Sequence, residues 1–266
     1  MAEVVVQGDD LAPAGVGTAR MAFAPHLRED LERFEALIEH RPLWQRVSAI
    51  TIACLVHGTV YFGANHFPSR EPRLLQLTAF DHWVPFIPLT AIIYMSAVPL
   101  SLVAFMTLKR VIDMRHFLEV FVVTVLVAGV VHWAVPTTYP RELFPLDTAA
   151  HPTGWLLELV RRVDTPSSCF PSLHVGLAFS GALALRQVHR RGWWAFLAWA
   201  VAIAISTLTT KQHYAADIVG GLVLAFVAVG LVERLNRRFE TLASIRKAES
   251  RAPELANAAP ADTSSS

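Results

Sequence analysis

Charged residues are scarce in this chain: they make up 17% of its 266 residues, whereas 53% are hydrophobic and the mean hydropathy is +0.41. A soluble domain carries about 25% charged residues, so the shortage points to a lipid bilayer as the solvent. A net charge of only +1, without a basic stripe interleaved with aromatics, excludes a generally basic nucleic-acid binder. Cys54 lies in an apolar run and Cys169 in a loop, and there is no other cysteine. We therefore expect neither a disulfide nor a thiolate metal site.

Apolar stretches long enough to cross a bilayer recur through the middle of the chain. A spanning helix needs about 20 mostly apolar residues. Six stretches qualify, with soft boundaries: 47–63, 83–108, 117–138, 170–188, 192–210 and 214–232. Pro88 and Pro99 predict kinks in the second stretch. The predicted fold class is therefore all-α, a polytopic membrane protein with six transmembrane helices in a bundle.

The flanking segments differ from this central region in composition. We expect residues 1–43 to form a cytoplasmic N-terminal segment, 44–234 the six-span catalytic membrane domain, and 235–266 a cytoplasmic, partly disordered tail. Apolar residues at helical spacing in 26–41 predict a short amphipathic helix, which either lies on the membrane surface or packs on the ends of the spans. Residues 154–164 predict another such helix, over the mouth of the bundle.

The distribution of lysine and arginine predicts the orientation. Most of the 23 basic residues lie in the terminal segments and in the loops on the same side as the termini. Because positive charge is retained in the cytoplasm, both termini are expected to be cytoplasmic. The start of the fourth stretch and the start of the sixth then face the opposite, extracytoplasmic side.

The sixth stretch begins with a histidine and an aspartate on one helical face. His213 and Asp217 are four residues apart, so their side chains adjoin on a helix. A carboxylate on one imidazole nitrogen fixes the tautomer and leaves the other nitrogen nucleophilic. Such pairs also serve as structural hydrogen bonds or proton relays, and the pair alone does not separate these roles.

The fourth stretch begins with Pro171, Ser172, Leu173 and His174. Proline suits the first turn of a helix, and the helix N-terminus with Ser172 offers a site for an anion. The charge distribution, which is independent of these residues, places His174 and His213 on the same membrane face. Both would lie at the depth of a phospholipid phosphate.

These two segments resemble the motifs of the phosphatidic acid phosphatase type 2 superfamily, PSGH and SRxxxxxHxxxD, which are carried on a six-helix membrane bundle. Ser206, His213 and Asp217 match the second motif in register, while Thr207 replaces its arginine and Leu173 replaces the glycine of the first. The superfamily's KxxxxxxRP motif is absent. These departures resemble the branch of inositol-phosphorylceramide synthases and related bacterial proteins, which implies a bacterial plasma (inner) membrane.

The resemblance implies a phosphohistidine mechanism without cofactor or metal. His213 would attack phosphorus, Asp217 would orient it, and His174 would act as acid and then base. Ser172, Arg141 and Lys211 would bind the phosphoryl oxygens. Asp81 and His82 would bind a headgroup or cap the second span. His132 is expected to be a hydrogen-bond partner between helices.

Several functions remain open. The chain is either a lipid phosphate hydrolase, acting on phosphatidic acid or a polyprenyl phosphate, or a headgroup phosphotransferase, which the missing cationic elements favour. The partner is a membrane lipid: a phospholipid, a sphingolipid or a polyprenyl phosphate. A remote alternative is a metal-binding transporter, because several histidines lie toward the outer face with Asp217: His66, His82, His132, His151, His174 and His213.

Overall fold

Helices account for most of the chain in the computed structural model, which describes residues 42–164, 167–186, 188–189 and 191–257. The long helices are α2 (Pro42–His66), α5 (Ala97–Thr107), α6 (Val111–Ala134), α8 (Leu173–Leu185), α9 (Trp193–Thr209) and α10 (Ala215–Asn257). The short elements are β1 (Arg73–Leu74), α3 (Ala79–Trp83), η1 (Pro88–Thr90), α4 (Ala91–Met95), β2 (Thr137–Thr138), η2 (Arg141–Leu143) and α7 (Gly154–Val163). The predicted N-terminal amphipathic helix at 26–41 lies outside the described residues.

Four helical stretches are long and apolar enough to cross a membrane: Leu43–His66, Pro88–Thr107, Val111–Ala134 and Ala215–Ile245. Helices α8 and α9 are apolar but shorter, with 13 and 17 residues. The second stretch is broken between α4 and α5, as Pro99 predicted, because proline has no N–H to donate to the carbonyl of Met95. Pro88 begins η1, where a missing N–H removes no helical hydrogen bond.

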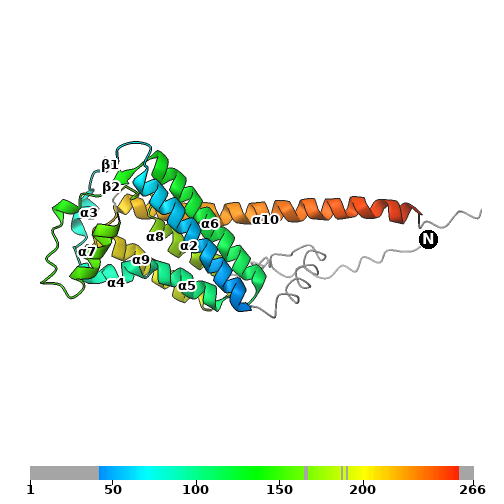
Figure 1. Cartoon of the computed structure of the whole chain (residues 1–266), viewed down its shortest axis with the longest axis horizontal. Helices are drawn as coiled ribbons and strands as arrows, with labels where there is room; N and C mark the ends of the chain where they lie inside the picture. The colour runs from blue at the N-terminus through cyan, green and yellow to red at the C-terminus, as the bar shows by residue number, and fades with distance from the viewer. Residues whose placement is uncertain (1–41, 165–166, 187, 190, 258–266) are drawn as a thin grey trace, which may run out of the picture.

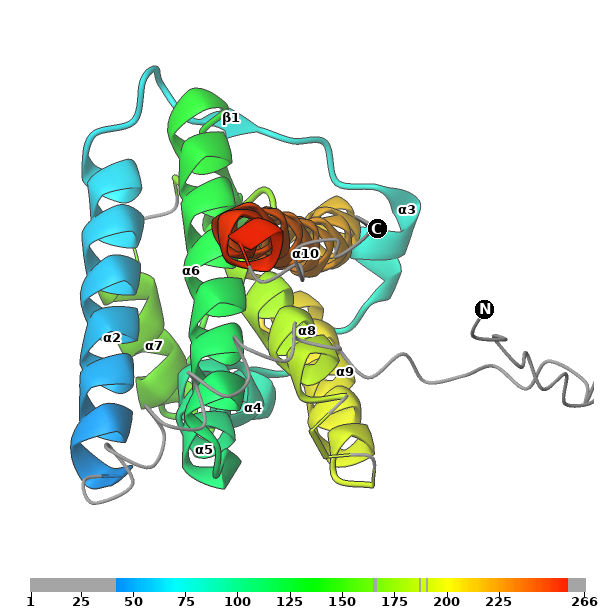
Figure 2. The same ribbon diagram turned by 90° about the vertical axis from the view of Figure 1, so that its right-hand side faces the viewer.

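Helix α8 occupies the centre of the bundle, where it packs against α6, α9 and α10, and α2 packs on the far side of α6 (Figure 2). The main core is formed by buried aliphatic and aromatic residues of α2, α5, α6, α8 and α10, among them Phe105, Phe117, Val125, Leu177 and Leu224. Many other apolar side chains of the spans are exposed, for example Leu55, Val130 and Phe226. An apolar outer surface is expected of a bundle whose solvent is lipid.

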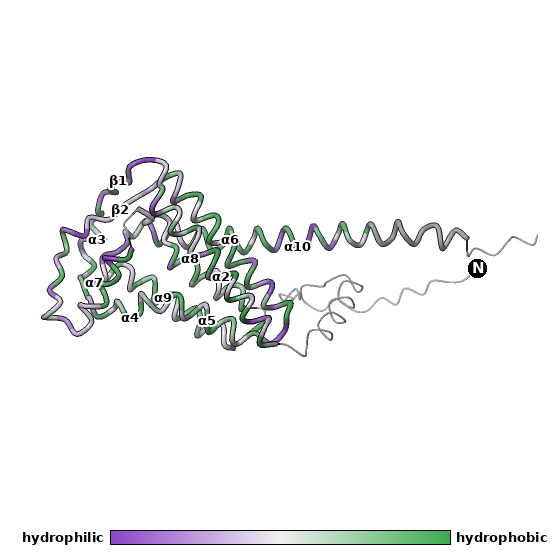
Figure 3. The backbone as a smooth tube through the Cα atoms, viewed as in Figure 1, coloured by the Kyte–Doolittle hydropathy of each residue, from purple (hydrophilic) through white to green (hydrophobic). Residues whose placement is uncertain are grey.

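The loops gather at one end of the bundle, together with α3, α7, β1 and β2 (Figure 1). Hydrophilic residues concentrate in these loops, whereas the bundle helices are mainly hydrophobic (Figure 3). Strands β1 and β2 pair in parallel, and Thr137 also bridges to Ser168. Three segments far apart in sequence are thereby joined immediately before α8.

Glycine allows α10 to approach the start of α8 closely. A Cβ atom at Gly221 would lie 2.7 Å from the carbonyl oxygen of Ser172 and 2.8 Å from the Cβ of Val175. Nothing larger than glycine fits there without a shift of the backbone. The close contact brings the two sequence motifs together.

A clamp of Asp81 and Lys211 holds the turn that links α9 to α10. Asp81 is 2% exposed; its Oδ1 accepts a hydrogen bond from the amide of Ala215 (2.7 Å), and its Oδ2 accepts from the amide and hydroxyl of Thr78. Burial alone would raise the pKa of Asp81, but these hydrogen bonds and the nearby Lys211 charge outweigh it and lower the pKa. The anion also lies at the positive end of α10.

Lys211 completes the clamp from the other side. Its φ of 54° is in the left-handed region, which costs a residue other than glycine about 1 kcal/mol. The Nζ atom donates to the carbonyls of Asp81 and Val84, both at 2.6 Å, and lies 4.9 Å from the ring centroid of Phe144. These contacts offset the cost of the unusual backbone conformation.

Two sequence predictions outside the spans have different outcomes. The helix predicted over the mouth of the bundle is confirmed as α7, which buries Leu157 and Val160 and exposes Trp155. The tail at 235–266 is expected from its composition to be partly disordered, whereas α10 continues through it to Asn257. Local composition missed this continuation because the helix propagates from a long, packed span.

Asp81→Asn tests the clamp. The substitution keeps the shape but removes the charge and replaces the Oδ2 acceptor, so we expect a loss of about 2 kcal/mol in the free energy of unfolding. Thermal unfolding of the full chain in detergent would show a lower Tm. His82→Gln is the matched control, because the adjacent His82 side chain is exposed and its replacement should change stability by less than about 0.5 kcal/mol. Equal effects of the two substitutions would contradict the clamp.

Candidate active site

His213 and Asp217 form a buried pair at the start of α10. His213 Nδ1 lies 3.1 Å from Asp217 Oδ2 and 3.1 Å from the carbonyl oxygen of Cys169. Both partners are acceptors, so the Nδ1 atom carries the proton and the lone pair is on Nε2. Asp217 is fully buried, and its Oδ2 also accepts from the amide of Tyr214 at 2.9 Å. The carboxylate thus sets both the tautomer and the orientation of the ring.

His174 approaches this pair from the first turn of α8. Its ring centroid is 6.0 Å from that of His213 and 4.2 Å from that of Tyr94, which packs against it at an interplanar angle of 30°. Ser172 is the N-cap of α8 and accepts from the amide of Val175. The two histidines, 39 positions apart in sequence, therefore face one space.

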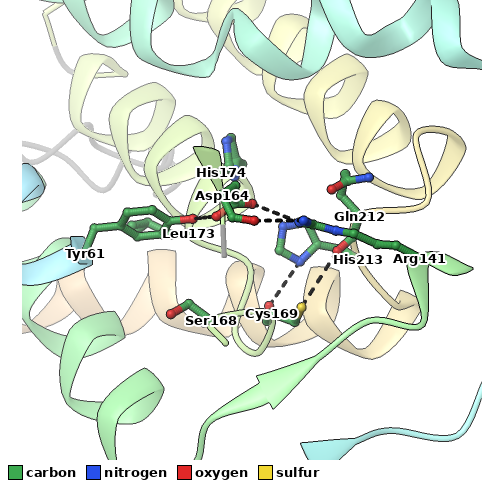
Figure 4. Close-up of a pocket in the computed structure, with 9 residues that line it drawn as sticks. All are labelled: Tyr61, Arg141, Asp164, Ser168, Cys169, Leu173, His174, Gln212 and His213. Atoms are coloured by element: carbon green, nitrogen blue, oxygen red, sulfur yellow. Dashed lines mark hydrogen bonds and ion pairs between the residues drawn. The ribbon is translucent and has the colours of Figure 1, made fainter. Parts of the chain in front are cut away.

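That space is a pocket at the loop end of the bundle (Figure 4). Its lining residues come from α2, the 139–170 loop region, α8 and the α9–α10 turn: Tyr61, Arg141, Asp164, Ser168, Cys169, Leu173, His174, Gln212 and His213. Arg141 is the one cationic side chain other than histidine in this lining. It is therefore the lining residue best suited to bind a phosphate.

Asp164 holds Arg141 in the pocket wall. Arg141 Nη2 lies 3.2 Å from Asp164 Oδ2, and Nη1 donates to the Asp164 carbonyl at 2.8 Å. The hydroxyl of Tyr61, on α2, donates to the other carboxylate oxygen of Asp164. Arg141 Nε is buried and has no hydrogen-bond partner among the described residues. The guanidinium therefore keeps a donor that none of the described protein groups uses.

Four residues predicted to bind phosphate or headgroup lie outside this lining. Ser172 is fully buried, with its amide bound to the carbonyl of Asp217 (3.0 Å). Lys211 and Asp81 belong to the clamp, and the side chain of His82 is exposed on α3. Of the predicted residues, the structure brings together His174, His213, Asp217 and Arg141.

Tyr61, Asp164 and Gln212 were missed by the sequence reading. Tyr61 lies in the first span and Asp164 at the end of α7, with no motif around either residue. Gln212 offered one signal, since it directly precedes His213. An uncharged amide in a helix-linking turn nevertheless has no distinctive pattern.

The metal alternative has one candidate cluster in the described part of the chain. Ligand atoms of Cys169, His213 and Asp217 lie within 4.8 Å of one another. Burial, together with the Asp217 charge, raises the pKa of the Cys169 thiol well above its usual value, so it stays protonated. Its Sγ is 3.9 Å from the carbonyl oxygen of Gln212, and the His213 nitrogen nearest the cluster carries a proton. A hydrogen-bonded network accounts for this cluster better than a metal centre.

His132 fixes the backbone in front of α8. It is 1% exposed on α6, and its Nε2 lies 2.8 Å from the carbonyl oxygen of Pro171. His132 is thus a hydrogen-bond partner, as predicted, but its acceptor lies in the segment before α8 rather than on a second helix. Because the acceptor is a carbonyl, Nε2 is the donor.

Two substitutions that differ in side-chain length test the hydrogen bond from His132 Nε2 to Pro171. Glutamine places an amide N–H near the position of Nε2, whereas asparagine is too short. We expect His132→Gln to stay near the wild-type Tm and His132→Asn to lose about 1–2 kcal/mol, the cost of an unpaired buried carbonyl. If both variants unfold at the same temperature, the hydrogen bond to Pro171 does not hold this segment.

Comparison with protein families agrees with this geometry, although no curated protein and no solved structure matches the chain. The family model described as PAP2 superfamily matches residues 70–231, which is more than half of the chain. The matched region includes Arg141, His174, His213 and Asp217. The chain therefore belongs to the PAP2 superfamily.

Proposed function

We propose that the protein is a membrane enzyme that transfers the phosphoryl group of a lipid phosphate through a phosphohistidine on His213. Superfamily members are generally phosphatases, which supports an enzyme, and the apolar helices indicate a membrane protein with a lipid substrate. The observation that carries the proposal is the His213 ring. Two acceptors hold its Nδ1 proton, and His174 lies across the pocket.

The reaction follows from these positions in two displacements. In the first, His213 Nε2 attacks phosphorus, the P–N bond forms, the bond to the leaving oxygen breaks, and protonated His174 gives its proton to that oxygen. In the second, neutral His174 takes the proton of an acceptor hydroxyl, whose oxygen attacks phosphorus while the P–N bond breaks. Asp217 stabilises the positive charge on His213 in both steps.

Phosphate binding is assigned to Arg141 and to the start of α8. The free Nε–H of Arg141 donates to a phosphoryl oxygen, and the helix N-terminus at Leu173 and His174 favours the anion. Ser172 contributes as the N-cap of that helix. Lys211 and Asp81 act indirectly, by holding the turn that carries His213.

The charge of the pocket favours a headgroup phosphotransferase, similar to the inositol-phosphorylceramide synthases, over a phosphomonoesterase. The positive charge of Arg141 is compensated by Asp164, so the pocket wall has little excess charge. A monoanionic phosphodiester fits such a site better than a dianionic monoester. A simple lipid phosphate hydrolase shares the same first step and is the second candidate.

We further propose that α8 and α9 complete a six-helix bundle with its site on the extracytoplasmic side of a bacterial plasma membrane. The start of α2 and the end of α10 point away from the loop end that carries the site (Figure 1). This arrangement agrees with the basic residues near both termini, which favour the cytoplasm. The central domain would then span 44–234.

Trapping the phosphoenzyme tests the mechanism. With phospholipids labelled at phosphorus, acid-labile label should appear on the wild type and not on His213→Ala. His174→Ala should slow both formation and decay of the label, by about 10²- to 10⁴-fold, because it removes the general acid and base. Vanadate should inhibit and EDTA should not. Turnover by His213→Ala, or EDTA sensitivity, would reject the phosphohistidine route.

Asp164→Asn tests the charge argument. Asparagine keeps the shape and an acceptor for Arg141 but removes the negative charge. We expect the ratio of kcat/KM for phosphatidic acid to kcat/KM for a phosphodiester lipid to rise roughly tenfold, which corresponds to about 1.4 kcal/mol. An unchanged ratio would show that Asp164 does not select substrate charge.

The products of the wild-type enzyme separate the two candidate functions. A new phosphodiester identifies a transferase, and free phosphate identifies a hydrolase.

A further inference from the structure

Gln212 presents an unused hydrogen-bond acceptor to the pocket. The residue is 1% exposed, lies between Lys211 and His213, and lines the same cavity as the two histidines (Figure 4). Its Nε2 atom donates to the carbonyls of Thr210 (3.1 Å) and Lys211 (3.2 Å). Its Oε1 atom is buried and has no hydrogen-bond partner in the part of the chain that the structure describes.

The orientation of this amide is determined by its surroundings. A reversed amide would place Oε1 against two carbonyl oxygens and lose both hydrogen bonds. The oxygen is therefore the atom left without a partner. An unsatisfied buried acceptor costs about 1–3 kcal/mol, and such groups are rare in native proteins. A bound ligand that supplies a donor would remove this cost.

The phosphate itself cannot be that donor. An ionised phosphodiester has only acceptor oxygens, and these suit the free Nε–H of Arg141 rather than Gln212 Oε1. Besides the two histidines, the lining thus contains an unpaired donor, Arg141 Nε–H, and an unpaired acceptor, Gln212 Oε1. A ligand that satisfies both atoms carries a hydrogen-bond donor in addition to the phosphate.

We propose that Gln212 Oε1 accepts a hydrogen bond from a hydroxyl group that the substrate presents beside the reacting phosphate, which makes Gln212 a specificity-determining residue. The proposal rests on the proposed function, because it requires a lipid phosphate in this pocket. Two sources provide this hydroxyl. One is the headgroup that stays on phosphorus after the first displacement, and the other is the acceptor that attacks in the second.

The first experiment compares two phosphodiester lipids of equal charge in mixed micelles. Phosphatidylglycerol carries headgroup hydroxyls and phosphatidylethanol carries none. If the headgroup is the source, wild-type enzyme should release diacylglycerol from phosphatidylglycerol with the higher kcat/KM. Gln212→Met, which has a similar length but no acceptor, should lower that preference about three- to tenfold, the contribution of one hydrogen bond.

Two further variants separate recognition from damage to the turn. Gln212→Glu and Gln212→Met both lose the donations of Nε2 to the carbonyls of Thr210 and Lys211, but only Glu keeps an oxygen acceptor. Gln212→Glu should therefore retain more of the preference between the lipids than Gln212→Met, even if both rates fall. Lys211→Met removes the clamp from the same turn without altering the pocket lining, so it should lower both rates and leave their ratio unchanged. A ratio that falls equally in all three variants would overturn the proposal.

The second experiment addresses the acceptor. Label is chased from the trapped phosphoenzyme with glycerol or with 1-propanol, which differ in their additional hydroxyls. If the acceptor is the source, Gln212→Met should lose the wild-type preference for glycerol over 1-propanol in the chase, whatever its rate of phosphoenzyme formation. If Gln212→Met changes neither the lipid ratio nor the acceptor ratio, Gln212 does not recognise a hydroxyl, although the phosphohistidine mechanism stands. If the wild type forms no phosphoenzyme from any phospholipid, the proposed function itself fails.

Discussion

Asp217 is the residue through which the two halves of the site are connected. Its carboxylate holds the ring of His213, and its main-chain carbonyl accepts the amide of Ser172 at the start of α8. The side chain is fully buried, and two protein donors, His213 Nδ1 and the amide of Tyr214, orient its Oδ2. Gly221, on the next turn of α10, keeps the two helices close enough for these bonds. The distance between His174 and His213 follows from this contact.

The rest of the site depends on loops held against that rigid pair. The β1–β2 pairing and the bridge to Ser168 fix the segment that leads into α8. On the other side, Asp81 and Lys211 fix the turn that carries Gln212 and His213. Functional residues on loops are precise only when their backbone is tied to a scaffold, and here the ties are the strand pairing of β1 with β2 and the hydrogen bonds of Asp81 and Lys211.

The departures from the superfamily motifs change the positive charge that is available at the site. The motif arginine is replaced by Thr207, which is fully buried and donates to the carbonyl of Ala204. Arg141 supplies a cation from a different loop, and Asp164 and Tyr61 orient it. A site with one compensated cation stabilises less negative charge than a site with several. That difference is the basis of the preference for phosphodiesters that we propose.

Local sequence patterns were sufficient to predict several helices and the reacting histidines. The four-residue spacing indicated that His213 and Asp217 adjoin, although His213 lies in the turn before α10 and not on the helix itself. Ser172 indicated where α8 starts, as its N-cap, whereas Pro171 lies before the helix and not in its first turn. Amphipathicity indicated α7. Only the tertiary structure decided three other features. The Lys211 side chain points to the carbonyls of Asp81 and Val84, Tyr61 pairs with Asp164, and the side-chain oxygen of Gln212 has no partner among the described residues. Each depends on a contact between segments far apart in the chain, whereas a local pattern reports on neighbours within one or two helical turns. Sequence spacing therefore identified the reacting histidines, and packing decided which charges and hydrogen-bonding groups surround them.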